Sequence, residues 1–182
     1  MSTFPPIGHD LTVGPIPIVE DETTFVPAGV LEIGYATRIV DSKAIARSAS
    51  VLGAVDDGRT AEQTEAYLRE LDENPPGGVA LHVREASTHR EYLRFDCFDD
   101  GPHYHYIVEP DVAQTIVGYD VDANGPVYPW ALERLRHHLP ALLTRAGRPD
   151  LAARLDPDAI AAAVDAVARG VADLERVSPT AA

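Results

Sequence analysis

The clearest pattern in the chain is a two-residue alternation of apolar and polar positions between residues 79 and 121. It runs through four short stretches, over residues 79–86, 91–98, 103–109 and 113–121, which tight turns separate. Alternation with period two indicates strands that have one apolar and one polar face. Links this short join antiparallel neighbours, so the pattern predicts a four-strand meander.

The rest of the chain adds one earlier strand and several helices. Residues 30–40 alternate in the same way and predict a fifth strand. Apolar residues at spacings of three and four predict helices over about 43–52, from Thr60 to Asn74, from Trp130 to Ala146, and from Asp156 onward. Pro140 should kink the third of these helices, because its ring clashes with the carbonyl group four residues back. The order predicts an α+β fold: a curved antiparallel sheet of about five strands with helices packed on one face.

The chain predicts one domain between two short terminal segments. Residues 1–28 contain five prolines and an acidic run, which indicates an extended arm rather than a helix. Residues 29–177 form the single α+β domain, and residues 178–182 form a frayed tail. A chain of 182 residues is long enough for one domain with a substantial core and too short for two comfortable ones.

Charge narrows the classes of partner. The formal net charge of −14 argues against nucleic acid or an anionic membrane, because both repel an acidic surface. No apolar run approaches the roughly 20 residues of a membrane span, and the first residues lack the basic and apolar segments of a secretory signal. We therefore expect a cytoplasmic protein that binds no nucleic acid and no membrane.

The second and third strands of the meander carry the most unusual polar residues of the chain. A tight turn over residues 99–102 joins them, and the expected register pairs Asp96 with His105. The following strand should place Ile116 beside His105. The resulting polar face carries His82, Arg84, Arg94, Asp96, Phe98, His103, His105 and Asp120. An ordinary solvent-facing sheet would show mostly Thr, Lys, Glu and Ser, so this face is the candidate site.

Three interpretations of the polar face stay open, and the first is a metal site. His103 and His105 would bind a divalent metal ion such as Zn, Fe, Mn or Ni, because residues i and i+2 of a strand project the same way about 6–7 Å apart. His82, Asp96 or Glu109 would complete the shell. The spacing His103-x-His105-x-x-x-Glu109 resembles the first metal motif of the cupins, although their second histidine motif is absent.

The second interpretation is catalysis without a metal. Asp96 would orient His105 as a general acid or base, with His103 beside it. An anionic substrate would need positively charged side chains to hold it and aromatic rings to line its pocket. The substrate-binding residues would be Arg94, Arg84, Phe98 and His82. Lyase, isomerase or hydrolase chemistry on a small polar or anionic molecule fits such a face, but the sequence leaves open whether the protein is an enzyme.

The third interpretation is a satisfied polar network, buried under the N-terminal arm or in a homodimer interface. The protein would then be a non-catalytic accessory or interaction protein. The apolar stripe of the last helix, over residues 160–174, is first of all core, but it is also narrow enough to be a dimer seam. We expect the protein to form a homodimer.

Cys97 is the only cysteine of the chain. A single cysteine excludes an intrachain disulfide and a cysteine-based zinc site within one chain. It falls on the apolar face, between Phe95 and Tyr104. That position predicts a small buried hydrophobic side chain rather than a nucleophile.

The amino-acid sequence of the hairpin resembles that of a known protein family. The block LRFDCFDDGPHYHY over residues 93–106, followed by Asn124-Gly125 and by residues 130–136, resembles a family of small bacterial proteins known only as a domain of unknown function. The resemblance covers roughly residues 78–146. It implies that the hairpin and the helix after it form one unit, and it implies no catalytic residue.

Overall fold

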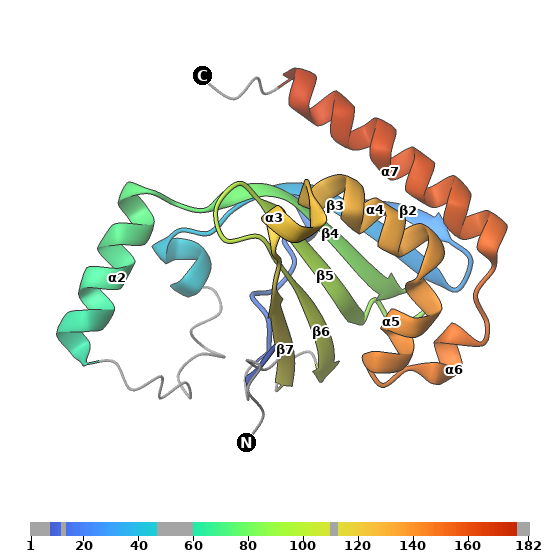
Figure 1. Ribbon diagram of the computed structural model, residues 1–182, viewed down its shortest axis with the longest axis horizontal. Helices are drawn as coiled ribbons and strands as arrows, with labels where there is room; N and C mark the ends of the chain where they lie inside the picture. The colour runs from blue at the N-terminus through green and yellow to red at the C-terminus, as the bar shows by residue number, and fades with distance from the viewer. Residues whose placement is uncertain (1–7, 12–13, 47–59, 110–112, 178–182) are drawn as a thin grey trace.

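The computed structural model describes residues 8–11, 14–46, 60–109 and 113–177, and it shows an open sheet with most of its helices on one face (Figure 1). The strands are β1 (His9–Leu11), β2 (Thr24–Ala28), β3 (Leu31–Ile39), β4 (Gly77–Glu85), β5 (Glu91–Phe98), β6 (His103–Glu109) and β7 (Ala113–Gly118). Their order is β1-β7-β6-β5-β4-β3-β2, and every neighbouring pair is antiparallel. The predicted α+β class is confirmed.

Helices lie on both sides of this sheet. They are α2 (Ala61–Glu73), α3 (Val121–Asn124), α4 (Val127–His137), α5 (Leu139–Arg145), α6 (Pro149–Ala152) and α7 (Pro157–Val177), with a 3-10 turn η1 (Glu20–Glu22). α4, α5 and α7 pack on one face, whereas α2 stands on the opposite, polar side (Figure 1). Of the helix predicted over 43–52, residues 42–46 are helical and the rest lies outside the described residues.

The hydrophobic core fills the space between the sheet and α4, α5 and α7. Its strand residues include Leu31, Ile33, Leu81, Leu93 and Phe95, and its helix residues include Leu135, Leu139, Leu143, Val164 and Val167. Each of these side chains is at most 1 % exposed. Burying a large aliphatic side chain stabilises a fold by about 1.5–3 kcal/mol. The apolar stripe of α7 is therefore core from Ile160 to Val171, as the sequence predicts, whereas Leu174 at its end is exposed.

The prediction of the hairpin register was wrong by two residues. Asp96 pairs with His103 and not with His105, because the last two residues of β5 extend beyond the strand pair and hydrogen-bond only toward β4. A shift of two residues keeps every side chain on its own face of a sheet. The predicted separation into faces therefore survives, and the predicted neighbour of His105 on β7, Ile116, is confirmed.

The N-terminal residues contribute two strands that the sequence analysis missed, so the sheet has seven strands in its described part rather than about five. β2 pairs with β3 and β1 pairs with β7, at opposite edges. Pro27 is tolerated in β2 because an edge strand does not need every backbone donor. Between these strands, residues 14–23 cross the polar face, where the Ile16 carbonyl accepts a hydrogen bond from Arg94 and Glu20 pairs with Arg84.

The helix starts predicted at Thr60 and Asp156 are confirmed, and the helix predicted from Trp130 to Ala146 is divided in two. Thr60 and Gln63 form a capping box at the start of α2, with hydrogen bonds of 3.2 and 2.8 Å. The Asp156 carboxylate accepts two backbone N–H groups in the first turn of α7. Pro140 is the second residue of α5, and in place of the predicted kink the helix breaks at His138, between α4 and α5.

The crossing of α7 over β3 depends on Gly170. A Cβ atom at this position would overlap the phenol ring of Tyr35. The missing side chain of Gly170 therefore leaves room for Tyr35 of the same chain. We expect Gly170→Ala to lower the free energy of unfolding by about 1–3 kcal/mol through overpacking, in spite of the better helix propensity of alanine. Equilibrium urea unfolding measures the change.

The matched control is Gly170→Ala in a Tyr35→Leu background. Without the ring, the same substitution should be neutral or stabilising by up to about 1 kcal/mol. Stabilisation in both backgrounds would contradict a tight crossing at this point.

The homodimer expected from the sequence stays a prediction.

Candidate metal centre and cleft

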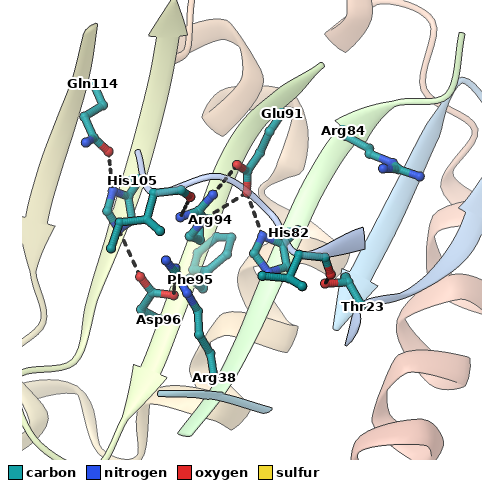
Figure 2. A network of polar contacts seen from close by, with 12 residues as sticks. Thr23, Arg38, His82, Arg84, Glu91, Arg94, Phe95, Asp96, His105 and Gln114 are labelled. Carbon is teal, nitrogen blue, oxygen red and sulfur yellow. Dashed lines mark hydrogen bonds and ion pairs between the residues drawn. The ribbon is translucent and has the colours of Figure 1, made fainter. Parts of the chain in front are cut away.

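The polar face of the sheet divides into two side-chain clusters (Figure 2). The first, which we call the Glu91 network, contains His82, Arg84, Glu91 and Arg94. The second, which we call the His–Asp cluster, contains Arg38, Asp96, His103, His105 and Gln114. Both come from residues that alternate with the core positions of β3 to β7, but their surroundings differ.

Glu91 is buried between two basic side chains. Its carboxylate accepts hydrogen bonds from Nε and Nη2 of Arg94, the first at 3.0 Å, and lies 2.7 Å from His82 Nδ1 (Figure 2). Burial alone would raise the pKa of Glu91, but the charge of Arg94, assisted by His82, lowers this pKa to about 2. The network is fully paired around this carboxylate, which matches the third interpretation of the polar face for this half.

Glu91 reaches the polar face through a β-bulge. β4 and β5 pair Val83 with Leu93 and then Arg84 with Glu91, so the ladder skips Tyr92. Strict alternation would instead place Tyr92 on the polar face. In the structure Tyr92 packs in the core on the helix side. No signal in the alternation reveals the bulge, but a buried Arg94 needs an acidic partner nearby.

The stability of the protein should depend on the protonation of Glu91. Its pKa falls from an ordinary 4.5 to about 2 on folding, so its stabilising effect is complete above about pH 4.5 and is lost as the pH falls toward 2. We expect a loss on the order of 3 kcal/mol from this group across that window. Urea unfolding at several pH values measures it, and Glu91→Gln should show a shallower slope. Equal slopes in both proteins would contradict the assignment.

The His–Asp cluster brings three ligand atoms together. Asp96 lies opposite His103 across the two strands, and His105 follows on the same face of β6. Asp96 Oδ2 is 3.1 Å from His105 Nε2 and 3.4 Å from His103 Nε2. The three ligand atoms lie within 4.8 Å of one another.

An oxygen acceptor holds the other nitrogen of each imidazole. His103 Nδ1 lies 2.8 Å from the Gly101 carbonyl oxygen, which can only accept, so Nδ1 carries a hydrogen. His105 Nδ1 lies 2.7 Å from Gln114 Oε1 (Figure 2), and in this amide orientation it too is the donor. Each Nε2 atom therefore points its lone pair at the Asp96 carboxylate. Three converging acceptors require a proton or a cation between them.

The electrostatics of the cluster favour a positive charge at its centre. Burial would raise the pKa of Asp96, yet the contacts of its carboxylate with the His103 and His105 imidazoles hold this pKa well below its ordinary value, and each contact becomes a hydrogen bond when the imidazole is protonated at Nε2. Burial opposes the charged form of His103, but the Asp96 carboxylate outweighs it and raises the pKa of His103. For His105 burial prevails and the pKa is lowered. Without a metal ion, His103 is therefore the imidazole that takes the proton.

Arg38 and Gln114 belong to the cluster, and the sequence analysis missed both. Arg38 Nη1 lies 3.4 Å from Asp96 Oδ1. The alternation over residues 30–40 places Arg38 on the polar face of β3, and Gln114 precedes Ile116 by two residues on β7, so both faces could be read from the sequence. The sequence does not show that β3 pairs with β4. This pairing leaves only one strand between Arg38 on β3 and Asp96 on β5.

A cleft of about 530 Å³ opens over the His–Asp cluster. His103, His105, Arg38 and Gln114 line it on the side of the sheet, and α2 and residues 14–16 line the opposite side. The His103 side chain is 25 % exposed, whereas that of His105 is 6 % exposed. The cluster is thus accessible to a small molecule from the side of His103.

Comparison with known proteins places the chain in a family. The family described as a domain of unknown function (DUF7700) matches residues 25–171. The chain belongs to this family. The DUF7700 match confirms the resemblance to an uncharacterised family, and it spans both clusters of the polar face. No curated protein and no solved structure matches the chain. Within its described residues, this DUF7700 chain has no helix long and apolar enough to cross a membrane.

The fold of this DUF7700 chain brings three of the predicted site residues, Asp96, His103 and His105, into one cluster. Phe98 lies on the wall of the cleft, with its ring edge-on to His103 at 5.9 Å between centroids. Arg94 also lines the cleft, but its guanidinium group is occupied by Glu91 and by the Ile16 carbonyl. The predicted catalytic and ligand-binding roles of these residues stay predictions.

The remaining predicted residues lie elsewhere. His82 and Arg84 do not line the cleft; Arg84 pairs with Glu20 and Glu32 and stacks on Phe25. Asp120 caps α3 through the backbone N–H of Ala123. The Glu109 side chain, a possible ligand in the cupin-like spacing, lies outside the described part of the chain.

Cys97 has the environment that the sequence predicts. It is 7 % exposed and belongs to the hydrophobic core. Burial, with a smaller effect from the nearby Asp96 carboxylate, raises the pKa of the Cys97 thiol to about 12. A thiol with this pKa is not a nucleophile at neutral pH, and its role is to pack between the sheet and the helices.

Proposed function

We propose that the protein is a divalent-metal-dependent enzyme that acts on a small anionic molecule in the cleft, with Asp96, His103 and His105 as the metal ligands. One observation carries the proposal: two imidazole Nε2 atoms and one carboxylate oxygen converge, while the Nδ1 atom of each imidazole is held by an oxygen acceptor. Metal-binding histidines have this arrangement, because the acceptor fixes the tautomer and the orientation of the ring.

The distances from Asp96 Oδ2 to the two imidazole nitrogens support a first-row metal ion. Two ligands about 2.0–2.1 Å from a zinc ion are about 3.3 Å apart at a tetrahedral angle, and Asp96 Oδ2 lies 3.1 and 3.4 Å from the two Nε2 atoms. Two imidazoles and one carboxylate suit Zn, Fe, Mn or Ni. Three protein ligands leave coordination positions open, as in catalytic rather than structural sites.

The surroundings of the ligands suit lyase, isomerase or hydrolase chemistry. A bound divalent ion supplies Lewis acidity and lowers the pKa of a water molecule that it holds. His103 and His105 line the cleft, so the open side of the cluster is the side that a ligand reaches. Arg38 lines the cleft and brings positive charge to it, which favours an anionic substrate, whereas the charge of Arg94 is paired with Glu91.

Elemental analysis tests the metal site. Wild-type protein loaded with Zn²⁺, Mn²⁺, Fe²⁺ or Ni²⁺ and then dialysed should retain one ion of at least one metal per chain. His103→Ala and His105→Ala should lose most of it while circular dichroism shows them folded. His137→Ala, at an exposed position on α4, is the matched control. Stoichiometric metal that survives both substitutions refutes the ligand set.

A second candidate is acid–base catalysis without a metal. The raised pKa of His103 and its partly exposed position at the cleft favour it, since a protonated imidazole beside a carboxylate is a competent general acid. Wild-type protein that retains none of the four metals after loading would support this candidate and count against the metal-dependent one. His103 is then the group that donates the proton to a ligand.

A further inference from the structure

Arg38 is the guanidinium group of the polar face that keeps a buried donor without a partner. Its Nη1 lies 3.4 Å from Asp96 Oδ1, near the outer limit of a hydrogen bond, and its Nη2 is buried with no hydrogen-bond partner among the described residues. Arg94, by contrast, uses all three of its nitrogen atoms on Glu91 and Ile16. Buried donors are almost always paired, so an unpaired one beside a cleft points to a ligand that supplies the acceptor.

Apolar side chains line much of the cleft around this donor. They come from five separate segments of the chain: Ile16, Val40, Leu71, Phe98 and Ile116. A volume of about 530 Å³ suits a small molecule. Glu70 and Asp100 also line the cleft, and both are exposed. Together with a net charge of −14, these carboxylates repel ligands that carry several negative charges.

We propose that the cleft binds a small monocarboxylate with an apolar body, and that Arg38 holds the carboxylate. A guanidinium group matches a carboxylate through two parallel hydrogen bonds. Nη2 of Arg38 has no acceptor among the described residues, and Nη1 has only its 3.4 Å contact with Asp96. The hydrocarbon part lies against the apolar walls. A ligand of this class would be the substrate of the proposed enzyme. The inference therefore rests on the proposed function for the part of the ligand that reacts at the metal.

The position of Arg38 also fixes which part of the ligand reaches the metal ligands. Arg38 lies against Asp96, one of the three proposed ligands. A carboxylate held by Arg38 therefore brings the substituent on its neighbouring carbon atom toward Asp96, His103 and His105. The reaction would take place at the carbon atoms next to the carboxylate.

Calorimetric titrations with defined probes test this substrate class, with and without bound Zn²⁺. Hexanoate and phenylacetate should bind at least about tenfold more tightly than the matched alcohols hexan-1-ol and 2-phenylethanol, because the alcohols leave the Arg38 donor unpaired. Arg38→Met should remove this difference while the protein retains its metal. Arg169→Met, at an exposed position on α7, should keep it.

Metal content measured on the same samples separates the two proposals. Alcohols that bind as tightly as the carboxylates, or citrate or phosphate that binds more tightly, would overturn this inference and leave the metal site untouched. Hexanoate binding that depends on Arg38 in protein that takes up no metal supports the carboxylate site and refutes the proposed function. If Arg38→Met fails to fold, Arg38→Lys keeps the charge without the planar fork and should weaken hexanoate binding severalfold. Unchanged affinity in Arg38→Lys also overturns the inference.

Discussion

Glu91→Gln is expected to lower the free energy of unfolding at pH 7 by about 3–5 kcal/mol. The substitution keeps the shape of the side chain and removes its charge. Arg94, which is 1 % exposed, would then hold a positive charge in the interior without an adjacent counter-charge, and His82 would lose its carboxylate partner. Equilibrium unfolding in urea, followed by circular dichroism, measures the change.

Two further variants show whether charge is the cause. Asp150→Asn breaks an ion pair with Arg148 at the surface, and it should leave the unfolding midpoint nearly unchanged, because exposed pairs contribute little. The double variant Glu91→Gln with Arg94→Met removes both charges of the buried pair and should lose less stability than the sum of the two single variants. A midpoint for Glu91→Gln equal to that of the wild type would show that the pair does not stabilise the fold.

Asp96→Asn is expected to weaken binding of the divalent ion by at least about 100-fold. The carboxylate is the anionic member of the proposed ligand set, and a neutral amide of the same shape binds hard and borderline cations far less strongly. The three atoms that converge within 4.8 Å would then include no anionic group. The positively charged Arg38 would still lie beside them. Competition against a fluorescent chelator measures the affinity.

The cleft offers a matched control for this substitution. Asp100 also lines the cleft but is exposed and outside the cluster, so Asp100→Asn should change the affinity by less than about twofold. Gln114→Leu removes the acceptor that holds His105 Nδ1 and should cost about 10–100-fold. An unchanged affinity in Asp96→Asn, with a loss in Asp100→Asn, would place the ion elsewhere in the cleft.

The sequence predicts the faces of the meander well, because the period of a strand is a local property. His103 and His105 alternate with Tyr104 and Tyr106 whatever the pairing partner is, and a register error of two residues leaves the alternation intact. For the same reason the three residues of the proposed metal site could be selected before the structure was known. Turn residues and caps such as Thr60 are local as well.

Features that depend on distant pairing escape such an analysis. The bulge beside Glu91 shifts the ladder by one residue, and only the partner strand β4 reveals it. Arg38 lies 58 residues before Asp96, so their contact needs the order of β3, β4 and β5. β2 holds a proline, which weakens any sequence signal for a strand, although its edge position permits one.

The segment that crosses the polar face joins the two opposite edges of the sheet. β1 lies at one edge and β2 at the other, and residues 14–23 run between them, held by Arg94 at Ile16 and by Arg84 at Glu20. The segment thus works as a tie between the two edges of an open sheet, because Arg84 of β4 and Arg94 of β5 hold it against the polar face. The family match begins at residue 25. A protein trimmed to that boundary would keep the three side chains of the proposed metal site and its helices. It would lose the tie and the wall of the cleft that residues 14–16 form.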